Sequence, residues 1–138
     1  MELREKGLIK EIKEDNTPVS NGDLEVNRIL TEKINNLTPQ IPIVSEETSH
    51  NKSKKDLKNF WLIDPIDGTY DYINDLDEFT LNAGLIINNR AVAGIIYAPA
   101  KNRLFYSYDK GCSYEIINNR HIKLDCSKIS NKKLKFVS

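Results

Sequence analysis

Two aspartates that directly follow a bulky apolar segment carry the clearest chemical signal in this sequence. Residues 60–63 read Phe-Trp-Leu-Ile, and the next residues are Asp64, Pro65, Ile66, Asp67, Gly68 and Thr69. A short run of large apolar side chains that stops at turn-forming residues predicts a buried strand. Pro65 fixes its own φ and restricts Asp64 to an extended conformation, so both carboxylates leave the strand end in a defined geometry.

These two carboxylates predict a site for a hard cation. With the Ile66 carbonyl between them and no His or Cys beside them, Asp64 and Asp67 favour Mg²⁺ over zinc. Gly68 permits a left-handed turn whose amides approach an anion closely, and a helical turn over residues 70–73 would place the Gly68 and Thr69 amides at its start. The alternative at this point is a simple connection, because Asp-Pro and Asp-Gly pairs are common turn formers.

A helix is predicted before this segment. Pro18 keeps Thr17 extended, and Ser20 or Asn21 is a suitable N-cap for a helix that ends near residues 35–36. The apolar positions recur at helical spacing and predict one buried stripe, made of Val26, Ile29, Leu30, Ile34 and Leu37. Asp23 falls in the first turn, where the helix dipole favours a carboxylate.

The other elements are predicted to be short strands. Residues 8–13 meet helical spacing only in part, and residues 41–44 form a short apolar strand, which Ser45, Glu46 and Glu47 follow. After Thr69, alternating apolar residues and Asn- or Gly-containing turns predict an antiparallel meander with strands over 79–87, 91–98, 103–108, 112–117 and 134–137. Tyr97, Tyr106, Tyr108 and Tyr114 are explained as sheet packing rather than as a base-stacking platform. The fold class is therefore α+β, with one or two helices packed on a mainly antiparallel sheet.

Composition limits the function classes. The chain has 138 residues, 39% hydrophobic and 29% charged, which is typical of one modest domain. The formal net charge is zero, so no global basic field recruits nucleic acid. No apolar run approaches the roughly 20 residues that span a bilayer. Cys112 and Cys126 are not in a Cys-x-x-Cys pair and no secretory signal precedes them, so we expect reduced thiols and a cytoplasmic location.

Several segments together resemble a known family. The run from Asp64 to Thr69, preceded by Trp61 and by residues 45–47, resembles the signature of the inositol monophosphatase superfamily of magnesium-dependent phosphatases. Three further segments resemble its CysQ branch, the 3'(2'),5'-bisphosphate nucleotidases: residues 17–23, residues 37–44 and residues 78–82. Tyr70 departs from the lysine that this branch usually carries. The resemblance runs from about Ile9 to the last residue, and it implies a strand rather than a helix over residues 8–13.

The resemblance implies an activity and a site. The expected reaction is magnesium-dependent hydrolysis of a small phosphorylated substrate, such as adenosine 3',5'-bisphosphate to AMP and phosphate. By similarity, one Mg²⁺ is held by Glu46, Asp64 and the Ile66 carbonyl, and a second by Asp64 and Asp67. Thr69, with Glu46 or Asp23, would orient the attacking water, and Gly68 and Thr69 would bind the substrate phosphate. Alternatives are an inositol monophosphatase-like activity or a non-catalytic remnant of a split gene.

The resemblance also implies that parts of the family pattern are absent. Residues 1–138 are expected to form a single domain equivalent to the N-terminal half of the sugar-phosphatase fold, without the family's long opening helix. The C-terminal half, with its Trp-Asp-x-Ala-Ala motif, would supply another ligand for the second Mg²⁺, so that site is expected to be incomplete. Exposed apolar surface is expected in consequence, and with it a homo-oligomer or a complementing C-terminal chain.

Overall fold

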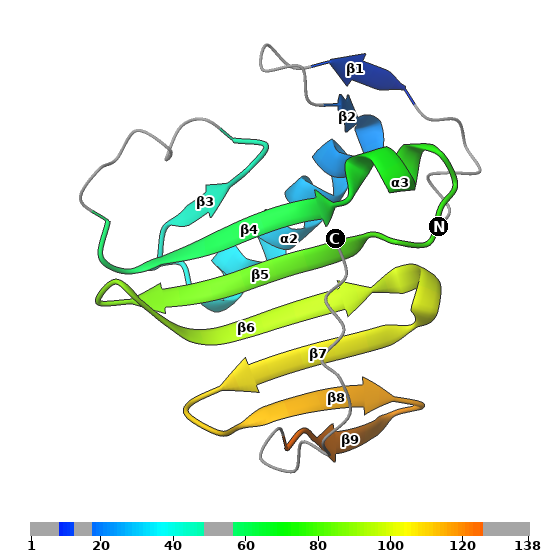
Figure 1. Ribbon diagram of the computed structural model, residues 1–138. Coiled ribbons are helices and arrows are strands. Elements are labelled where there is room, and N and C mark those ends of the chain that lie inside the picture. The colour runs from blue at the N-terminus through cyan, green and yellow to red at the C-terminus, as the bar shows by residue number, and fades with distance from the viewer. Residues whose placement is uncertain (1–8, 13–17, 49–56, 126–138) are drawn as a thin grey trace.

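The fold consists mainly of one large sheet with a long helix packed on one of its faces (Figure 1). The computed structural model describes residues 9–12, 18–48 and 57–125. Its helices are α2 (Asn21–Leu37), α3 (Thr69–Ile73) and the 3₁₀ helix η2 (Pro99–Lys101). Its strands are β1 (Lys10–Ile12), β2 (Pro18–Ser20), β3 (Ile43–Ser45), β4 (Phe60–Asp67), β5 (Thr80–Ile87), β6 (Arg90–Ala98), β7 (Arg103–Tyr108), β8 (Ser113–Ile117) and β9 (Arg120–Lys123).

Seven of these strands form one sheet in the order β3-β4-β5-β6-β7-β8-β9, and β1 pairs with β2 separately. From β4 to β9 every neighbouring pair is antiparallel, whereas β3 lies parallel to β4. Tight turns with Asn at positive φ join several of the strands, at Asn88-Asn89 and Asn118-Asn119. Asn tolerates this conformation, so the local sequence itself specifies the hairpins. The predicted α+β class and the antiparallel meander are confirmed.

Helix α2 begins with a complete capping box. Ser20 is the N-cap, its hydroxyl accepts the N–H groups of Gly22 and Asp23, and the Asp23 carboxylate accepts the Ser20 N–H at 2.8 Å. These bonds satisfy amides that the helix itself leaves unpaired at its N-terminus. The predicted start of the helix is confirmed, with Ser20 rather than Asn21 as its cap.

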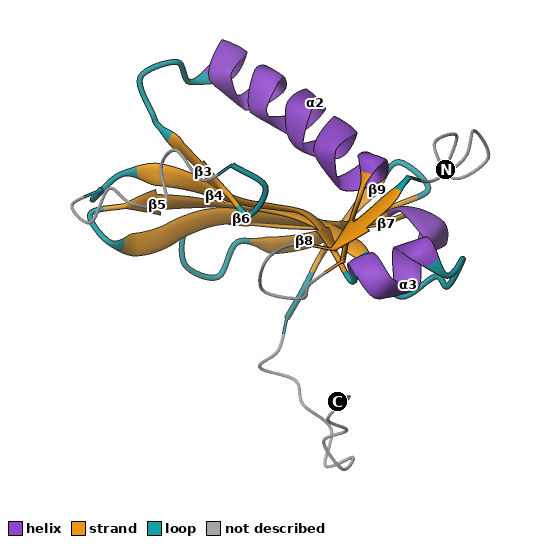
Figure 2. Cartoon of the chain, turned by 90° about the horizontal axis from the view of Figure 1, so that it is seen from above, coloured by secondary structure: helices purple, strands orange, loops and turns teal. Residues whose placement is uncertain are grey.

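The buried stripe predicted for α2 is wrong in part. Ile29 is 42% and Leu37 81% exposed, while the buried helix residues are Gly22, Asp23 and Asn27. The helix lies over β3 and β4 at one side of the sheet (Figure 2), so its stripe is only partly covered. The polar Asn27 side chain can be buried because its Oδ1 accepts the Ser45 hydroxyl at 2.5 Å, a bond that joins α2 to the end of β3.

A small core joins α3 to the sheet and to α2. Tyr72 and Phe79 pack edge to face with ring centroids 5.1 Å apart, and Ile66 and Ile73 complete the buried cluster. The Tyr72 ring also covers Gly22, where a Cβ atom would lie 2.5 Å from Cε1 of that ring. The absence of a side chain at Gly22 therefore lets the start of α2 approach α3 closely.

Strand bounds differ from the sequence predictions at several places. β3 covers residues 43–45 rather than 41–44, β4 continues through Asp64 to Asp67, and β9 was not predicted. The strand predicted at 134–137 lies outside the described residues. Within the described part of the chain, no helix is both long and apolar enough to span a membrane.

We predict that Gly22→Ala destabilises the protein by about 1–3 kcal/mol, because the added methyl group overlaps a buried ring that Phe79 holds in place. Urea unfolding followed by circular dichroism measures this change. Gly84→Ala is the control, since its Cβ would meet no atom closer than 4.0 Å. Equal losses of stability in the two variants would contradict the assigned contact.

Candidate metal and phosphate site

A β-bulge in β4 places the two predicted metal-binding aspartates on the same face of the sheet. Asp64 lies opposite Asn82 on β5, and Asp67 lies opposite Thr80, with a register shift between the two pairs. Side chains three residues apart in a regular strand point to opposite faces. The bulge adds one residue to β4, so that Asp64 and Asp67 lie opposite two residues of β5 that share a face. Pro65 occupies the bulge, where the missing N–H breaks no regular ladder.

Asp64 lies in a crowded acidic environment. It is only partly exposed, and its Oδ1 atom is buried without a hydrogen-bond partner. Burial, the neighbouring Glu46, which hydrogen-bonds to Asp64, and the charges of Asp67 and Asp23 together raise the pKa of Asp64 to about 7. Glu46 reaches this position from the turn after β3, where its N–H donates to the Ile63 carbonyl at 3.1 Å.

Asp23 and Thr69 meet across the fold, although 46 residues separate them in the sequence. The Thr69 hydroxyl lies 3.0 Å from Asp23 Oδ1 and 3.0 Å from the Ile66 carbonyl oxygen. Asp23 is 1% exposed, and its other oxygen, Oδ2, accepts the Ser20 N–H and the Ser20 hydroxyl. The carboxylate therefore caps α2 with one oxygen and holds Thr69 with the other.

Gly68 is required at the turn that follows β4. Its φ is +93°, and a Cβ atom there would lie 2.7 Å from the Glu78 carbonyl oxygen. The residue is the N-cap of α3, so the helix begins at Thr69 and the predicted helical turn over residues 70–73 is confirmed. The first amides of a helix have no intrahelical partner and face outward from its start.

The residues at this site fit a hard cation. Among the described residues, no three Asp, Glu, His or Cys side chains are gathered closely enough to hold an ion as they stand. Like-charged carboxylates repel one another when no cation lies between them, and a bound cation would reduce this repulsion. The unpartnered Asp64 Oδ1 and the all-oxygen donor set are what Mg²⁺ binding needs. Glu46, Asp64, Asp67 and the Ile66 carbonyl stay the predicted ligands.

One residue of this site was missed by sequence reasoning. Asn82 donates its side-chain N–H to Asp67 Oδ2 at 3.0 Å and lies opposite Asp64 in the sheet. Its segment, residues 78–82, was recognised only as part of a family resemblance. Because the bulge decides which residues of β4 and β5 face each other, strand periodicity alone could not place Asn82 beside both aspartates.

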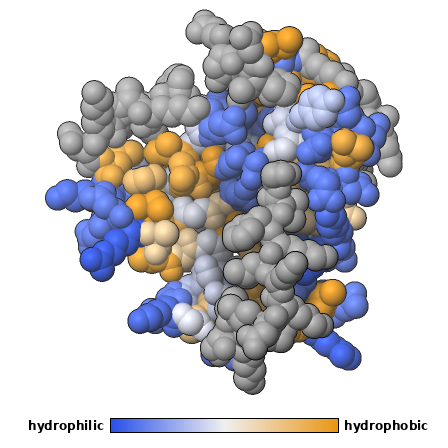
Figure 3. Space-filling model, viewed as in Figure 1, coloured by the Kyte–Doolittle hydropathy of each residue, from blue (hydrophilic) through white to orange (hydrophobic). Residues whose placement is uncertain are grey.

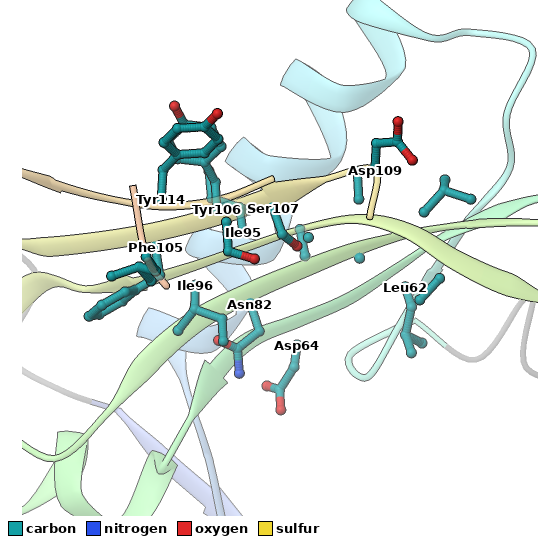
Figure 4. Close-up of a pocket in the computed structure, with 18 residues that line it drawn as sticks. Leu62, Asp64, Asn82, Ile95, Ile96, Phe105, Tyr106, Ser107, Asp109 and Tyr114 are labelled. Carbon is teal, nitrogen blue, oxygen red and sulfur yellow. The ribbon is translucent and has the colours of Figure 1, made fainter. Parts of the chain in front are cut away.

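A groove adjoins the site on the face of the sheet that α2 does not cover. It has a volume of about 640 Å³, and Asp64 and Asn82 lie at one end of it (Figure 4). The strand register brings small residues together across its floor, at Gly84, Gly94, Ser107 and Ser113. Figure 4 shows the Tyr106 and Tyr114 rings on the opposite side of the sheet, where they stack with centroids 5.2 Å apart.

Comparison with known proteins identifies the family of this chain. The sequence pattern of the inositol monophosphatase family matches residues 1–136. The chain belongs to the inositol monophosphatase family. Family relatives include a "3'(2'),5'-bisphosphate nucleotidase CysQ" of Aggregatibacter actinomycetemcomitans, 38% identical over 122 residues, which are 87% of this chain and 45% of that protein. The protein of the same name from Haemophilus influenzae is 42% identical over 105 residues, which are 75% of this chain and 39% of that protein.

Solved structures agree with this family. An IMPase of Thermotoga maritima superposes with a TM-score of 0.69 at 26% identity, over 86% of this chain and 44% of that one. The expected resemblance to the inositol monophosphatase superfamily and to its CysQ branch is thus confirmed. The chain spans less than half the length of the curated relatives named above.

The raised pKa of Asp64 predicts a pH-dependent stability in the absence of metal. A carboxyl group whose pKa is higher in the folded than in the unfolded state stabilises the fold most at low pH. This contribution is lost as the pH rises from about 3.8 to about 7. Asp64→Asn should therefore flatten the fall in stability across this range, as measured by urea unfolding in EDTA. Parallel pH profiles for the two proteins would show that Asp64 is not the responsible group.

Proposed function

We propose that this chain carries the metal- and phosphate-binding part of a Mg²⁺-dependent phosphomonoesterase that acts on a nucleoside 3',5'-bisphosphate. The observation that carries the proposal is the β4 bulge, which brings Asp64 and Asp67 to one face and leaves Asp64 Oδ1 buried and unpartnered. The names of the CysQ relatives support the substrate class. Adenosine 3',5'-bisphosphate would be converted to AMP and inorganic phosphate.

The proposed ligands are the side chains of Glu46, Asp64 and Asp67 together with the Ile66 carbonyl. Bound Mg²⁺ would supply charge neutralisation at the phosphate and lower the pKa of a coordinated water. Glu46 directly follows β3 and the other ligands belong to β4, and these neighbouring strands pair directly. The sheet therefore fixes the relative positions of the ligand-bearing segments before an ion binds.

The hydrogen bond between Thr69 and Asp23 supports a proton-accepting role for this pair in the proposed reaction. When the Thr69 hydroxyl donates to Asp23 Oδ1, its lone pairs are available to accept a hydrogen bond from a water molecule. As the water oxygen forms a bond to phosphorus and the phosphorus–oxygen ester bond breaks, the water proton passes to Thr69, and Thr69 passes its own to Asp23. The leaving oxygen takes up a proton from solvent. The Gly68 and Thr69 amides would hold the phosphate at the start of α3.

Two alternatives differ in substrate or in activity. Inositol 1-phosphate is the alternative substrate, since the chain shares the fold of inositol monophosphatases and Tyr70 stands where the CysQ branch usually carries a lysine. A non-catalytic remnant is the alternative to an enzyme. The chain spans 39–45% of the CysQ relatives, and the polypeptide beyond that span is not required to form the Asp23–Thr69 contact.

Phosphate release tests the activity. The purified chain should release phosphate from adenosine 3',5'-bisphosphate only with Mg²⁺, and faster than from inositol 1-phosphate. Asp64→Asn should reduce the rate to background, because it removes an anionic ligand that both proposed Mg²⁺ ions share. Asp109→Asn is the matched control in a turn at the far end of the groove. Release by Asp64→Asn at the parent rate would refute the assigned site. No release by the folded parent chain would favour the remnant.

The open face of the sheet is the proposed contact for further polypeptide. Leu62 is 50% and Ile96 47% exposed there, and apolar surface gathers over this side of the sheet (Figure 3). Exposed apolar surface around a groove of this size indicates an interaction site. Because the relatives are more than twice as long as the matched span, we propose that the rest of a family member, in the same protein or in a second chain, packs on this face.

Co-expression tests this contact. The chain should co-purify with the part of the Haemophilus influenzae relative that it does not span, and Ile96→Lys should weaken the complex at least about tenfold, because it places an unpaired charge in an apolar contact. Ile29→Lys is the control, since Ile29 is an isoleucine of similar exposure on α2, behind the sheet. Equal effects of the two changes, or self-association of the chain through this face in light scattering, would contradict the proposal.

A further inference from the structure

Asn82 connects the two aspartates of the site from the neighbouring strand. It is the direct partner of Asp64 in the register of β4 and β5, yet its side-chain nitrogen donates to Asp67 Oδ2 at 3.0 Å. Only the bulge brings Asp67 within reach of a residue that pairs with Asp64. Asn82 therefore contacts both sides of the bulge: its backbone position pairs with Asp64, and its side-chain amide binds Asp67.

The orientation of this amide follows from the charge next to it. A carboxylate accepts hydrogen bonds and cannot donate them, so the Asn82 nitrogen must face Asp67 and the amide oxygen must face away. That oxygen, Asn82 Oδ1, is buried and has no hydrogen-bond partner. On the other side of Asn82 the sheet offers Ile96, whose side chain supplies no donor (Figure 4).

A structural role does not explain Asn82. The bond to Asp67 is exposed to solvent and therefore adds little to stability, while the buried unpaired oxygen costs stability. A leucine of similar size would pack against Ile96 and bury no polar atom at this position. The amide is useful only if the Asp67 carboxylate has to be held in one orientation.

We propose that Asn82 is a positioning residue of the Mg²⁺ site. This inference rests on the function proposed above. Its amide holds Asp67 through Oδ2 and leaves Oδ1 of that carboxylate for the cation. It also keeps Asp67 from turning away from the negative charges of Asp64 and Glu46 when no ion is bound. Partners that orient a metal-binding carboxylate in this way commonly change metal affinity 10–100-fold.

Mn²⁺ is the probe for this role, because it accepts the same oxygen ligands as Mg²⁺ and its free form is detected by electron paramagnetic resonance. Asn82→Leu in the full chain should raise the Kd for Mn²⁺ by at least about tenfold. In EDTA, the urea midpoint of the variant should stay equal to or exceed that of the parent. Asn59→Leu is the control, since Asn59 also makes a side-chain hydrogen bond, with the Asn88 N–H, but at the far end of the sheet.

The outcomes separate this inference from the proposed function. An unchanged Kd in Asn82→Leu would overturn the positioning role while leaving the metal site intact. A lower urea midpoint in EDTA would also overturn it, because Asn82 would then act through stability. Absence of Mn²⁺ binding by the parent chain would overturn the metal site, and the positioning role with it.

Discussion

The β-bulge at Pro65 is the constraint on which the site depends. Two aspartates three residues apart on a regular strand would lie on opposite faces of the sheet. The extra residue in the bulge brings both side chains to the same face. The bulge can form there because β3 pairs only with residues 61–63 of β4, so no strand of the described residues pairs with that edge of β4 at Pro65. The geometry of the site therefore depends on the short length of β3, on its place next to β4 and on the proline in the bulge.

Crowding of carboxylates at this bulge opposes folding. The buried, unpartnered oxygens of Asp64 and Asn82 each cost about 1–3 kcal/mol relative to paired groups, and the charges of Glu46 and Asp67 raise the free energy of ionised Asp64. The small core around Tyr72 and Phe79, with the closely packed Gly22, lies beside the site and stabilises the fold there by burying apolar surface. A cation bound between these carboxylates would reduce the repulsion between their charges.

Local features of the sequence predicted most of the elements. The capping box at Ser20, the turns at Asn88-Asn89 and Asn118-Asn119, and the Gly68 turn are all encoded within a few residues. Long-range features were not predictable in the same way. The bulge register, the burial of Asn27 against Ser45 and the exposure of Leu37 depend on where α2 lies on the sheet, which periodicity does not report.

Asp23 shows why a structural and a chemical explanation for one residue need not compete. Its Oδ2 accepts both the N–H and the hydroxyl of Ser20, so the start of α2 depends on it. Its Oδ1 faces Thr69 at 3.0 Å, across the fold, at the start of α3. A carboxylate has two oxygens with separate lone pairs, so neither task uses the atom that the other needs. The cap fixes the carboxylate plane, and a fixed plane keeps Oδ1 aimed at Thr69.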